Sequence, residues 1–442
     1  MTQENSKQKG AKTKGTMMIF FAISLLQYMA ANFAHPITPT LIVNLQLRDY
    51  MFGAAFAAMS FTNFLFSPFW GKMREFFSVR RLILLGCVGY GFGQYLFSIA
   101  TTELEIILAR CAAGFFVGAI GVAALLYITE MSEEGKTGEN LAKFVIVQAL
   151  GAAGGYLIGG TVGVYSIKIT FLMQALTLVL CGILYFFLLQ DNKVERSKSV
   201  DRSFWKEINP LKAFWDCRSF MTKALAVLFV AVVLTGVGSV SFDQSFNYYL
   251  KAQFQLTPIY NGVMKAITGI ITLVAVSTVC MKLMKMAQLR RVTAIVSSLC
   301  AGSVAALFLV EGRIPFFGTA LLFFSFNAVC TPLIQDCVAR EATDSNRNLM
   351  MGFYNASRSL GMIGGALFAG FLYNYGARLP FVLAGGCFAL AAVILWMVSP
   401  RRTLSVGLMN DSPGLATDPA AHTVDPVADD GNNDGKHGKI KA

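Results

Sequence analysis

Ionisable side chains inside long apolar runs are the residues of this sequence that could do chemistry. The clearest is Asp243, in the stretch GSVSFDQSFNYYL (238–250), within an apolar run that begins near Ala224. An acid surrounded by hydrocarbon is rare, and burial favours its neutral form. Such a carboxyl group can take up a proton and release it when its exposure changes. The alternatives are an acid held permanently by an arginine, or an acid at a wetter interface.

Arg110 is the candidate partner of that acid. Counted at 1.5 Å per helical residue, Asp243 lies roughly 9 Å and Arg110 roughly 8 Å below the same membrane surface. An arginine beside the acid would favour its charged form, which opposes the effect of burial. We predict that the two residues serve proton coupling. The alternative is a structural Arg110 bonded to backbone carbonyls.

Three more ionisable residues lie in or near apolar runs. Asp336 and Arg358 both fall near the inner edge of their runs, and we predict that they pair there in a gate or scaffold. Lys265 is expected to extend its ammonium group to the outer surface, because long basic side chains commonly reach the interface.

Neutral polar and aromatic residues form a second set of candidates, for a substrate cavity. Asp243 and Asn247 share a helical face at a spacing of four. Each polar residue alone is more often a bond between helices, but together they could orient a ligand. The full set is Gln27, Tyr28, Asn32, Gln148, Phe242, Gln244, Phe246, Asn247, Phe326, Asn327 and Asn355.

The composition places these residues in a membrane. The chain is 55% hydrophobic and only 14% charged, whereas a soluble domain averages roughly 25% charged residues. Neither the nine cysteines nor the three histidines have the spacing of a zinc site, so no metal is expected. The sequence shows no HExxH motif and no phosphate-binding loop, which argues against an enzyme or an ATP-driven pump.

The elements that hold these residues are predicted to be twelve transmembrane helices, since a helix needs about 20 apolar residues to cross a bilayer. The runs are 17–35, 51–70, 82–100, 105–127, 142–163, 167–189, 224–249, 260–283, 292–310, 315–338, 349–373 and 379–399. The predicted organisation is a cytoplasmic tail (1–16), a six-helix bundle (17–190), a cytoplasmic loop with an amphipathic helix (191–223), a second six-helix bundle (224–400) and a disordered cytoplasmic tail (401–442).

Basic residues give the orientation. With both termini cytoplasmic, the outer connections hold few of the 37 Lys and Arg residues, and most of the rest face the cytoplasm. This asymmetry accounts for the net charge of +12 without nucleic acid as a partner. We therefore expect a multi-pass protein of the cytoplasmic membrane.

The two predicted bundles repeat a glycine pattern. The fifth run carries GAAGGYLIGG (151–160) and the eleventh GMIGGALFAG (361–370), so each stripe is in the fifth helix of its bundle. Glycines let helices pack closely, which would explain either stripe alone. Their shared position also indicates two similar bundles that rock about a central site.

At this point the sequence resembles a transporter of the major facilitator superfamily over residues about 15–400. The loop GKMREFFSVRR (71–81) is similar to the family's G-x-L-x-D-R-x-G-R-R motif, although Phe76, Ser78 and Val79 depart from it. The resemblance implies a cytoplasmic gate. Together with the pair proposed above, its residues are Gly71, Glu75, Arg80, Arg81, Asp336 and Arg358.

Two further motifs narrow the resemblance. LARCAAGFFVGAIG (108–121) is similar to the R-x-x-x-G pattern of proton-coupled members. The glycines Gly151, Gly155, Gly159 and Gly160 resemble the antiporter motif G-x-x-x-G-P-x-x-G-G, with Tyr156 in place of its proline. The stretches 242–270 and 348–365 look most like the drug:proton antiporters of Gram-positive bacteria. These carry a second acid on span ten, where this chain has Asn327.

The resemblance implies a monomeric secondary transporter whose first, fourth, seventh and tenth helices line the cavity. The function expected is proton-coupled export of amphipathic drugs or other small organic compounds, with a proton gradient in place of any cofactor. The alternative is a proton-coupled importer of a small organic solute. The identity of the substrate does not follow from the sequence.

Overall fold

The helices of the protein follow its apolar runs. The structure is a computed structural model and describes residues 2–74, 76–133, 136–190, 209, 218, 221–341 and 347–398. Its major elements are α1 (Thr2–Ala31), α2 (Thr38–Asn44), α3 (Met51–Met73), α4 (Val79–Ile99), α5 (Glu103–Met131), α6 (Thr137–Tyr165), α7 (Ile167–Leu188), α10 (Lys223–Ala252), α11 (Pro258–Val274), the π-helical segment η2 (Ala275–Cys280), α12 (Met281–Met284), α13 (Leu289–Leu309), α14 (Arg313–Ala339), α15 (Arg347–Tyr375) and α16 (Leu379–Met397).

Ten helical segments among these described residues are long and apolar enough to cross a membrane, with α11, η2 and α12 counted together as Pro258–Met284. The remaining two predicted runs also form helices, α1 and α15. In α1 the apolar part, Gly15–Ala31, is shorter than a full span. The prediction of an all-helical membrane protein is therefore confirmed.

Three local features were not predicted. The helix α1 begins at Thr2, well before its apolar part, and α2 occupies the connection that follows it. Pro39 at the start of α2 suits the first turn of a helix, where no backbone donor is needed. The π-helical segment η2 interrupts the eighth predicted span. The predicted amphipathic helix in 191–223 lies almost wholly outside the described residues, as does the tail 401–442.

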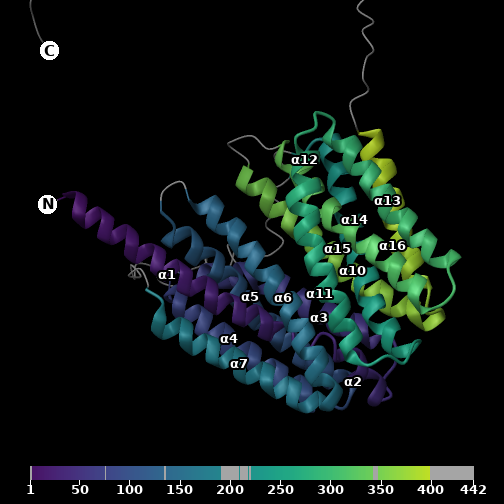
Figure 1. Ribbon diagram of the computed structural model, residues 1–442, viewed down its shortest axis with the longest axis horizontal. Helices are drawn as coiled ribbons and strands as arrows, with labels where there is room; N and C mark the ends of the chain where they lie inside the picture. The colour runs from purple at the N-terminus through teal and green to yellow at the C-terminus, as the bar shows by residue number, and fades with distance from the viewer. Residues whose placement is uncertain are drawn as a thin grey trace, which may run out of the picture. The chain divides into compact units, whose positions relative to one another are not determined.

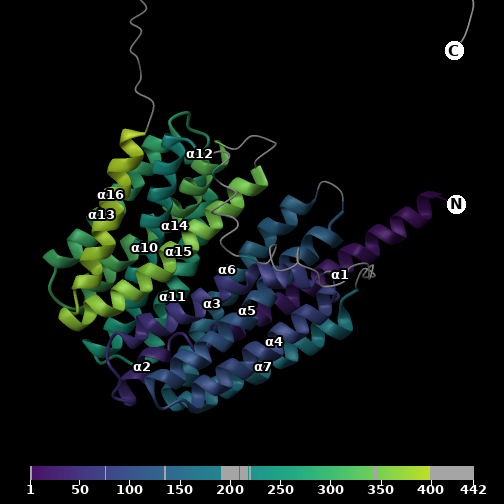
Figure 2. The same ribbon diagram turned by 180° about the vertical axis from the view of Figure 1, so that it is seen from behind.

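The helices form two groups that follow one another along the chain (Figure 1). Helices α1 to α7 form the N-half, in which α4 packs on α5 and α7, and α1 packs on α6 and α7. Helices α10 to α16 form the C-half, in which α10 packs on α15 and α16, and α13 on α14 and α16. The same division is visible from behind, with the N-half in purple and blue and the C-half in green and yellow (Figure 2).

Two seams join the halves: α6 packs against α11, and α3 packs against α15. Both seams are tightest near the connections that hold Tyr50, Pro258 and Tyr375, which we call the closed end. There, a Cβ added at Gly370 would lie 2.6 Å from the backbone oxygen of Tyr50. The opposite end of the helices, which holds Met73 and Arg347, is called the open end.

Candidate functional site

Three helices carry the charged side chains of the site, and the start of each is fixed locally. Thr102 and Glu105 form a capping box that begins α5, two turns before Arg110. The hydroxyl of Thr222 accepts the backbone N–H of Leu225 at 3.2 Å and begins α10, which carries Asp243. Pro258 in the first turn begins α11, which carries Lys265.

Asp243 of α10 forms an ion pair with Lys265 of α11. These two helices are neighbours in the C-half. The predicted partner was Arg110, and this prediction is wrong for the state described. Lys265 was expected to reach the outer surface, but its side chain is only 18% exposed and lies between the helices. The attraction of a partly buried carboxylate for the ammonium group outweighs the solvation available at the surface.

Aromatic rings of both halves surround this pair. The Nζ atom of Lys265 lies 5.0 Å from the ring centre of Phe324 in the C-half and 5.4 Å from that of Tyr156 in the N-half. Tyr156 in turn stacks on the His35 imidazole, with 5.5 Å between ring centres. Ring faces attract cations, so the lysine is held at the boundary between the halves.

Sequence reasoning did not assign Lys265, Tyr156 or His35 to the site. One signal was present: Tyr156 stands where the glycine motif of α6 has a proline. A large polar ring in a stripe of small residues must either prevent close packing or take a specific partner. The structure shows the second outcome.

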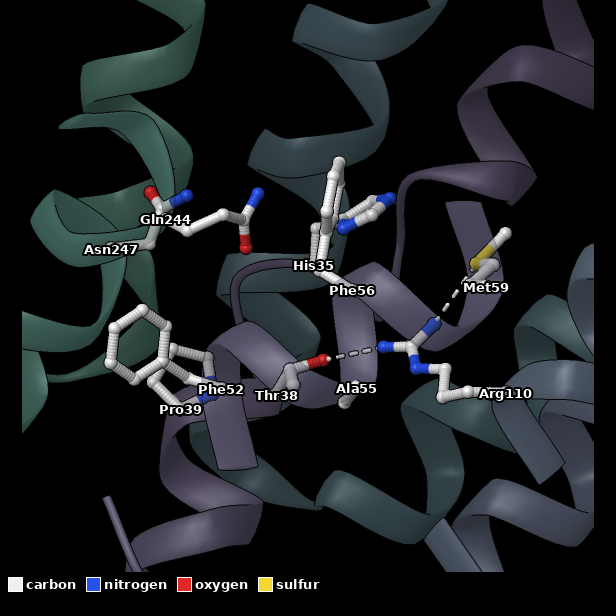
Figure 3. A pocket seen from close by; sticks show the side chains of 10 residues that line it. All are labelled: His35, Thr38, Pro39, Phe52, Ala55, Phe56, Met59, Arg110, Gln244 and Asn247. Carbon is white, nitrogen blue, oxygen red and sulfur yellow. Dashed lines mark hydrogen bonds between the residues drawn. The ribbon is translucent and has the colours of Figure 1, made fainter. Parts of the chain in front are cut away.

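Arg110 lies on the N-half side, 4% exposed. Its guanidinium donates to the Thr38 hydroxyl at 3.2 Å and to the Met59 sulfur at 3.5 Å (Figure 3). The same group lies over the ring of Phe97, 4.0 Å from its centre. Its Nε atom has no hydrogen-bond partner. No carboxylate of the described residues forms an ion pair with it.

A small cavity of about 20 Å³ separates Arg110 from α10 (Figure 3). A cavity of that size holds about one water molecule. Gln244 and Asn247 line it from the C-half, and His35 and Thr38 line it from the N-half. Arg110, Gln244 and Asn247 thus face a common space. Their roles in proton coupling and in substrate binding stay predictions.

The polar residues predicted on α1 and α6 bond within the N-half. Gln148 donates to the Tyr28 hydroxyl at 2.5 Å, which ties α6 to α1. Asn32 donates to the backbone oxygen of Tyr28 at 2.7 Å, one turn away. Gln27 is buried in the same helix. In this state these bonds hold the bundle together.

Two predicted cavity aromatics are core residues here. Phe242 and Phe246 are fully buried in the C-half. The Phe242 ring stacks on Phe323 at 3.8 Å, and Phe246 stacks on Phe316 at 5.8 Å. Each of them immediately precedes one of the pair Asp243 and Asn247, and adjacent residues point about 100° apart around a helix. The structure therefore places them behind the site.

The remaining predicted cavity residues lie in the C-half. Phe326 packs partly buried against its hydrophobic core. Asn327 accepts a hydrogen bond of 2.8 Å from Ser239, which joins α14 to α10.

A second, larger cavity of about 300 Å³ lies between α3 and α15, toward the open end. The predicted residue Asn355 lines it, together with Asn63 and Ser67 of the N-half and Ser359 of the C-half. Along the seam of α3 and α15, the two halves thus touch near the closed end and separate toward the open end. The space is lined by amides and hydroxyls of both halves and by apolar side chains such as Phe64 and Met362.

The closed end carries its own latch between the halves, formed by Asp49, Phe52, Tyr248 and Tyr373. The Tyr248 hydroxyl donates to Asp49 at 2.6 Å. The ring of Tyr248 stacks on Phe52 at 4.7 Å and meets Tyr373 edge-on at 5.1 Å. Beside the latch, a hydrogen bond to Glu103 raises the pKa of Tyr50. A polar bond and ring contacts thus join the two halves at this end.

The glycine stripes make two kinds of contact. In α6, Gly155 faces the backbone of α1 and Gly159 faces the connection that follows α1, where an added Cβ would overlap the backbone oxygens of Met29 and Phe33 respectively. Gly151 also faces α1, since its Cβ would lie 2.6 Å from that of Tyr28. Gly160 faces the other half instead, where an added Cβ would lie 2.8 Å from the backbone oxygen of Pro258.

The predicted gate is only partly described. Glu75 lies outside the described residues. Arg80 packs over the ring of Phe186, 5.3 Å from its centre, Arg81 is exposed and Gly71 has ordinary contacts. The ion pair of this region is one that the sequence did not reveal: Arg74 donates two bonds of 2.8 Å to Glu130, which joins α3 to α5.

The predicted gate pair between Asp336 and Arg358 is wrong. Asp336 pairs with Arg340, one turn later in α14, at 3.0 Å. The four-residue spacing brings these two groups together at almost no cost in chain entropy, whereas Arg358 lies on another helix.

No three His, Cys, Asp or Glu side chains gather as a metal site among the residues that the structure describes.

This architecture defines a class of protein: a multi-pass membrane protein with two helical halves and cavities at their boundary. The model of the Major Facilitator Superfamily matches residues 20–343 and 289–419, and the chain belongs to that family. It is a transporter, not an enzyme.

Similar sequences come from bacteria. Multidrug resistance protein 2 of Bacillus subtilis (strain 168) is 20% identical over 382 residues, covering 84% of this chain and 92% of that protein. Quinolone resistance protein NorA of Staphylococcus aureus (strain MRSA252) is 21% identical, covering 88% and 97%. Tetracycline resistance protein, class C, of Escherichia coli is 24% identical, covering 82% and 90%.

Solved structures support the fold. The nucleoside transporter NupG superposes with a TM-score of 0.69 at 12% identity, covering 87% of this chain and 98% of that one. The human organic anion transporter MFSD10 (TETRAN) superposes with a TM-score of 0.63 at 15% identity, covering 87% and 99%. At such identities the likeness concerns the fold alone.

Proposed function

We propose that the protein is a proton-coupled exporter of amphipathic drugs or other small organic compounds, working by alternating access in the cytoplasmic membrane. The proposal includes twelve crossings and cytoplasmic termini, which put the open end at the cytoplasm. The observation that carries it is the ion pair between Asp243 and Lys265 at the boundary between the halves.

The pair gives the proton a definite place to act. With Asp243 ionised, the two charges compensate one another in a medium of low dielectric. A proton on Asp243 removes the compensation and leaves Lys265 charged against the rings of Tyr156 and Phe324. Protonation therefore changes the contacts between the halves, which is what couples a proton to a conformational change.

The cavities support alternating access. The latch closes one end, while the 300 Å³ cavity lies toward the other. With cytoplasmic termini, this state would receive a compound from the cytoplasm. The sequence relatives named above include drug-resistance proteins, which agrees with export.

A reconstitution experiment tests the proposal. Wild-type protein in proteoliposomes is expected to move a panel of amphipathic dyes uphill when a pH gradient is imposed. Asp243→Asn keeps the shape of the side chain but cannot ionise, so it should lose uphill transport while keeping downhill exchange. Glu139→Gln is the matched control, because that exposed acid pairs with Lys143 on the same helix. Undiminished uphill transport by Asp243→Asn would refute the role of the pair.

A proton-coupled importer is the second candidate, and Arg110 is the observation that favours it. An anion beside Arg110 would compensate the charge that a proton on Asp243 leaves uncompensated, so that proton and anion would bind together. Transport in right-side-out and inverted vesicles separates the candidates. Export predicts that proton and compound move in opposite directions, and import predicts that they move together.

A further inference from the structure

We propose that the transported compound carries an anionic group, such as a carboxylate, on an apolar body, and that Arg110 binds this group. The inference rests on the proposed transport at this site, in either direction, because it names the class of compound for the same site. Its basis is a charged side chain that is buried, aimed into a cavity between the halves and left without an anion.

The hydrogen bonds of Arg110 leave much of its capacity unused. A guanidinium group has five N–H donors. One meets the hydroxyl of Thr38 and another the thioether of Met59, which is a weak acceptor, while Nε has none. The Thr38 hydroxyl itself donates to the backbone oxygen of Ala34 at 2.8 Å, so it completes a local chain of bonds.

The charge of Arg110 is also uncompensated within the described residues. The titratable groups that act on it include the phenols of Tyr90 and Tyr156, and neither is an anion at neutral pH. The carboxylate of Asp243 is occupied by Lys265. Buried charges in membrane proteins are normally paired, so an exception at a cavity indicates a charged ligand.

The lining of the cavity defines the rest of the compound. Phe52, Phe56 and Met59 offer apolar surface to the cavity, with Met59 next to Arg110, and Gln244 and Asn247 offer amide groups on the opposite side (Figure 3). A planar carboxylate can accept two parallel bonds from a guanidinium. At about 20 Å³ the cavity excludes such a compound here, so binding requires the halves to move apart around it.

Matched pairs of compounds test the inference by binding alone. The probes are 2-naphthoate with 2-naphthamide, and 9-anthracenecarboxylate with 9-anthracenecarboxamide. Each pair has the same rings and differs in charge. Protection of the full-length protein in detergent against thermal unfolding is measured as a function of concentration. The carboxylate is expected to bind about tenfold more tightly than its amide, as a charge-assisted pair implies.

Variants of Arg110 assign the preference to this side chain. Arg110→Gln should remove it, whereas Arg110→Lys should retain a part, since lysine keeps the charge but not the planar fork. Arg313→Gln is the control: it removes an exposed positive charge at the closed end and should leave the preference unchanged. If the Arg110 variants do not fold, the comparison within each pair of probes still decides.

Two results would overturn the inference. One is equal protection by both members of every pair in the wild type, including no protection by either. The other is a carboxylate preference that survives in folded Arg110→Gln. Uphill transport of a panel of neutral and anionic dyes by the wild type, measured separately, keeps the two proposals apart. Transport of any dye without a carboxylate preference in binding supports the exporter and rejects the anion site. A carboxylate preference in binding without uphill transport of any dye supports the anion site and rejects the exporter.

Discussion

The glycine stripes of α6 and α15 occupy corresponding places in the two halves, and a comparison shows what each contact does. Within its half, Gly155 of α6 faces the backbone of α1, and Gly365 of α15 faces the backbone of α10. Farther along, both helices turn small residues toward the other half, at Gly160 and at Gly370. The same glycine motif thus serves both the permanent packing within each half and the contact between the halves, which must open during transport.

The two seams differ in how far they extend. Along α6 and α11 the close approach continues to Gly269, whose added Cβ would lie 2.9 Å from that of Ala153. Along α3 and α15 it gives way to the 300 Å³ cavity. The difference suggests that in this state the second seam provides the opening and the first keeps the halves together. Substitutions in the two kinds of contact should therefore fail in different assays.

The largest effect is expected at the seam of α3 and α15. A Cβ at Gly53 would overlap the backbone oxygen of Ala366 in the other half, and a longer side chain has no space at all. Gly53→Leu should oppose closure by about 3 kcal/mol, or more than about 100-fold in population, and should abolish transport.

Spin labels on Lys168 and Arg313, exposed residues at the closed end of the two halves, would report this change as a longer distance. An unchanged distance in an inactive Gly53→Leu variant would show that Gly53 matters within its helix rather than between the halves.

A smaller loss is expected from Gly155→Ala, with a different signature. The overlap with Met29 lies inside the N-half, so the cost of about 1–3 kcal/mol should appear as a lower unfolding temperature. The distance between the spin labels should not change. Gly154→Ala is the neighbouring control, because its Cβ would meet only the Met29 side chain, at 3.4 Å. Equal destabilisation by both variants would contradict the assignment of contacts.

The latch should contribute less than the glycines. Tyr248→Phe removes the hydrogen bond to Asp49 and keeps the ring stacked on Phe52, so it should weaken closure by about 0.5–1.5 kcal/mol. The distribution of distances between the same labels measures this shift. Tyr249→Phe, on a ring that stacks on Phe316 within the C-half, should leave the distribution as it is. A larger change of the distance distribution in Tyr249→Phe than in Tyr248→Phe would show that the bond between Tyr248 and Asp49 does not hold this end closed.

The smallest effect is expected at Gly364, the neighbour of Gly365 in the α15 stripe. An added Cβ there would meet the Phe368 ring at 3.6 Å, which is an ordinary contact. Gly364→Ala should therefore leave transport unchanged and raise the unfolding temperature slightly, since alanine favours a helix by up to about 1 kcal/mol over glycine. A clear loss of stability would show that the stripe is packed more tightly than Gly365 alone implies.

The sequence predicted the helices well because hydropathy alone decides which segments can lie in a membrane. It also located Asp243 and Arg110, since charges in apolar runs are conspicuous. The partners of these residues depend on which faces of neighbouring helices meet, and hydropathy does not contain that information. For this reason Lys265 was assigned to the surface and Asp336 to Arg358. The assignment of Phe242 and Phe246 to the cavity was wrong for the same reason, because a phenylalanine in the core and one in a cavity look alike in the sequence.

The π-helical segment of the eighth span changes what that span can face. A π turn adds one residue to a helical turn, and each residue rotates the helix face by about 100°. The part before Ala275 packs on α6 in the other half, and the segment Ala275–Cys280 contacts α14 in its own half. A single inserted residue thus lets one continuous helix contact both halves. The part before the insertion holds Lys265 at the boundary between the halves, and the π-helical segment packs on α14 within the C-half.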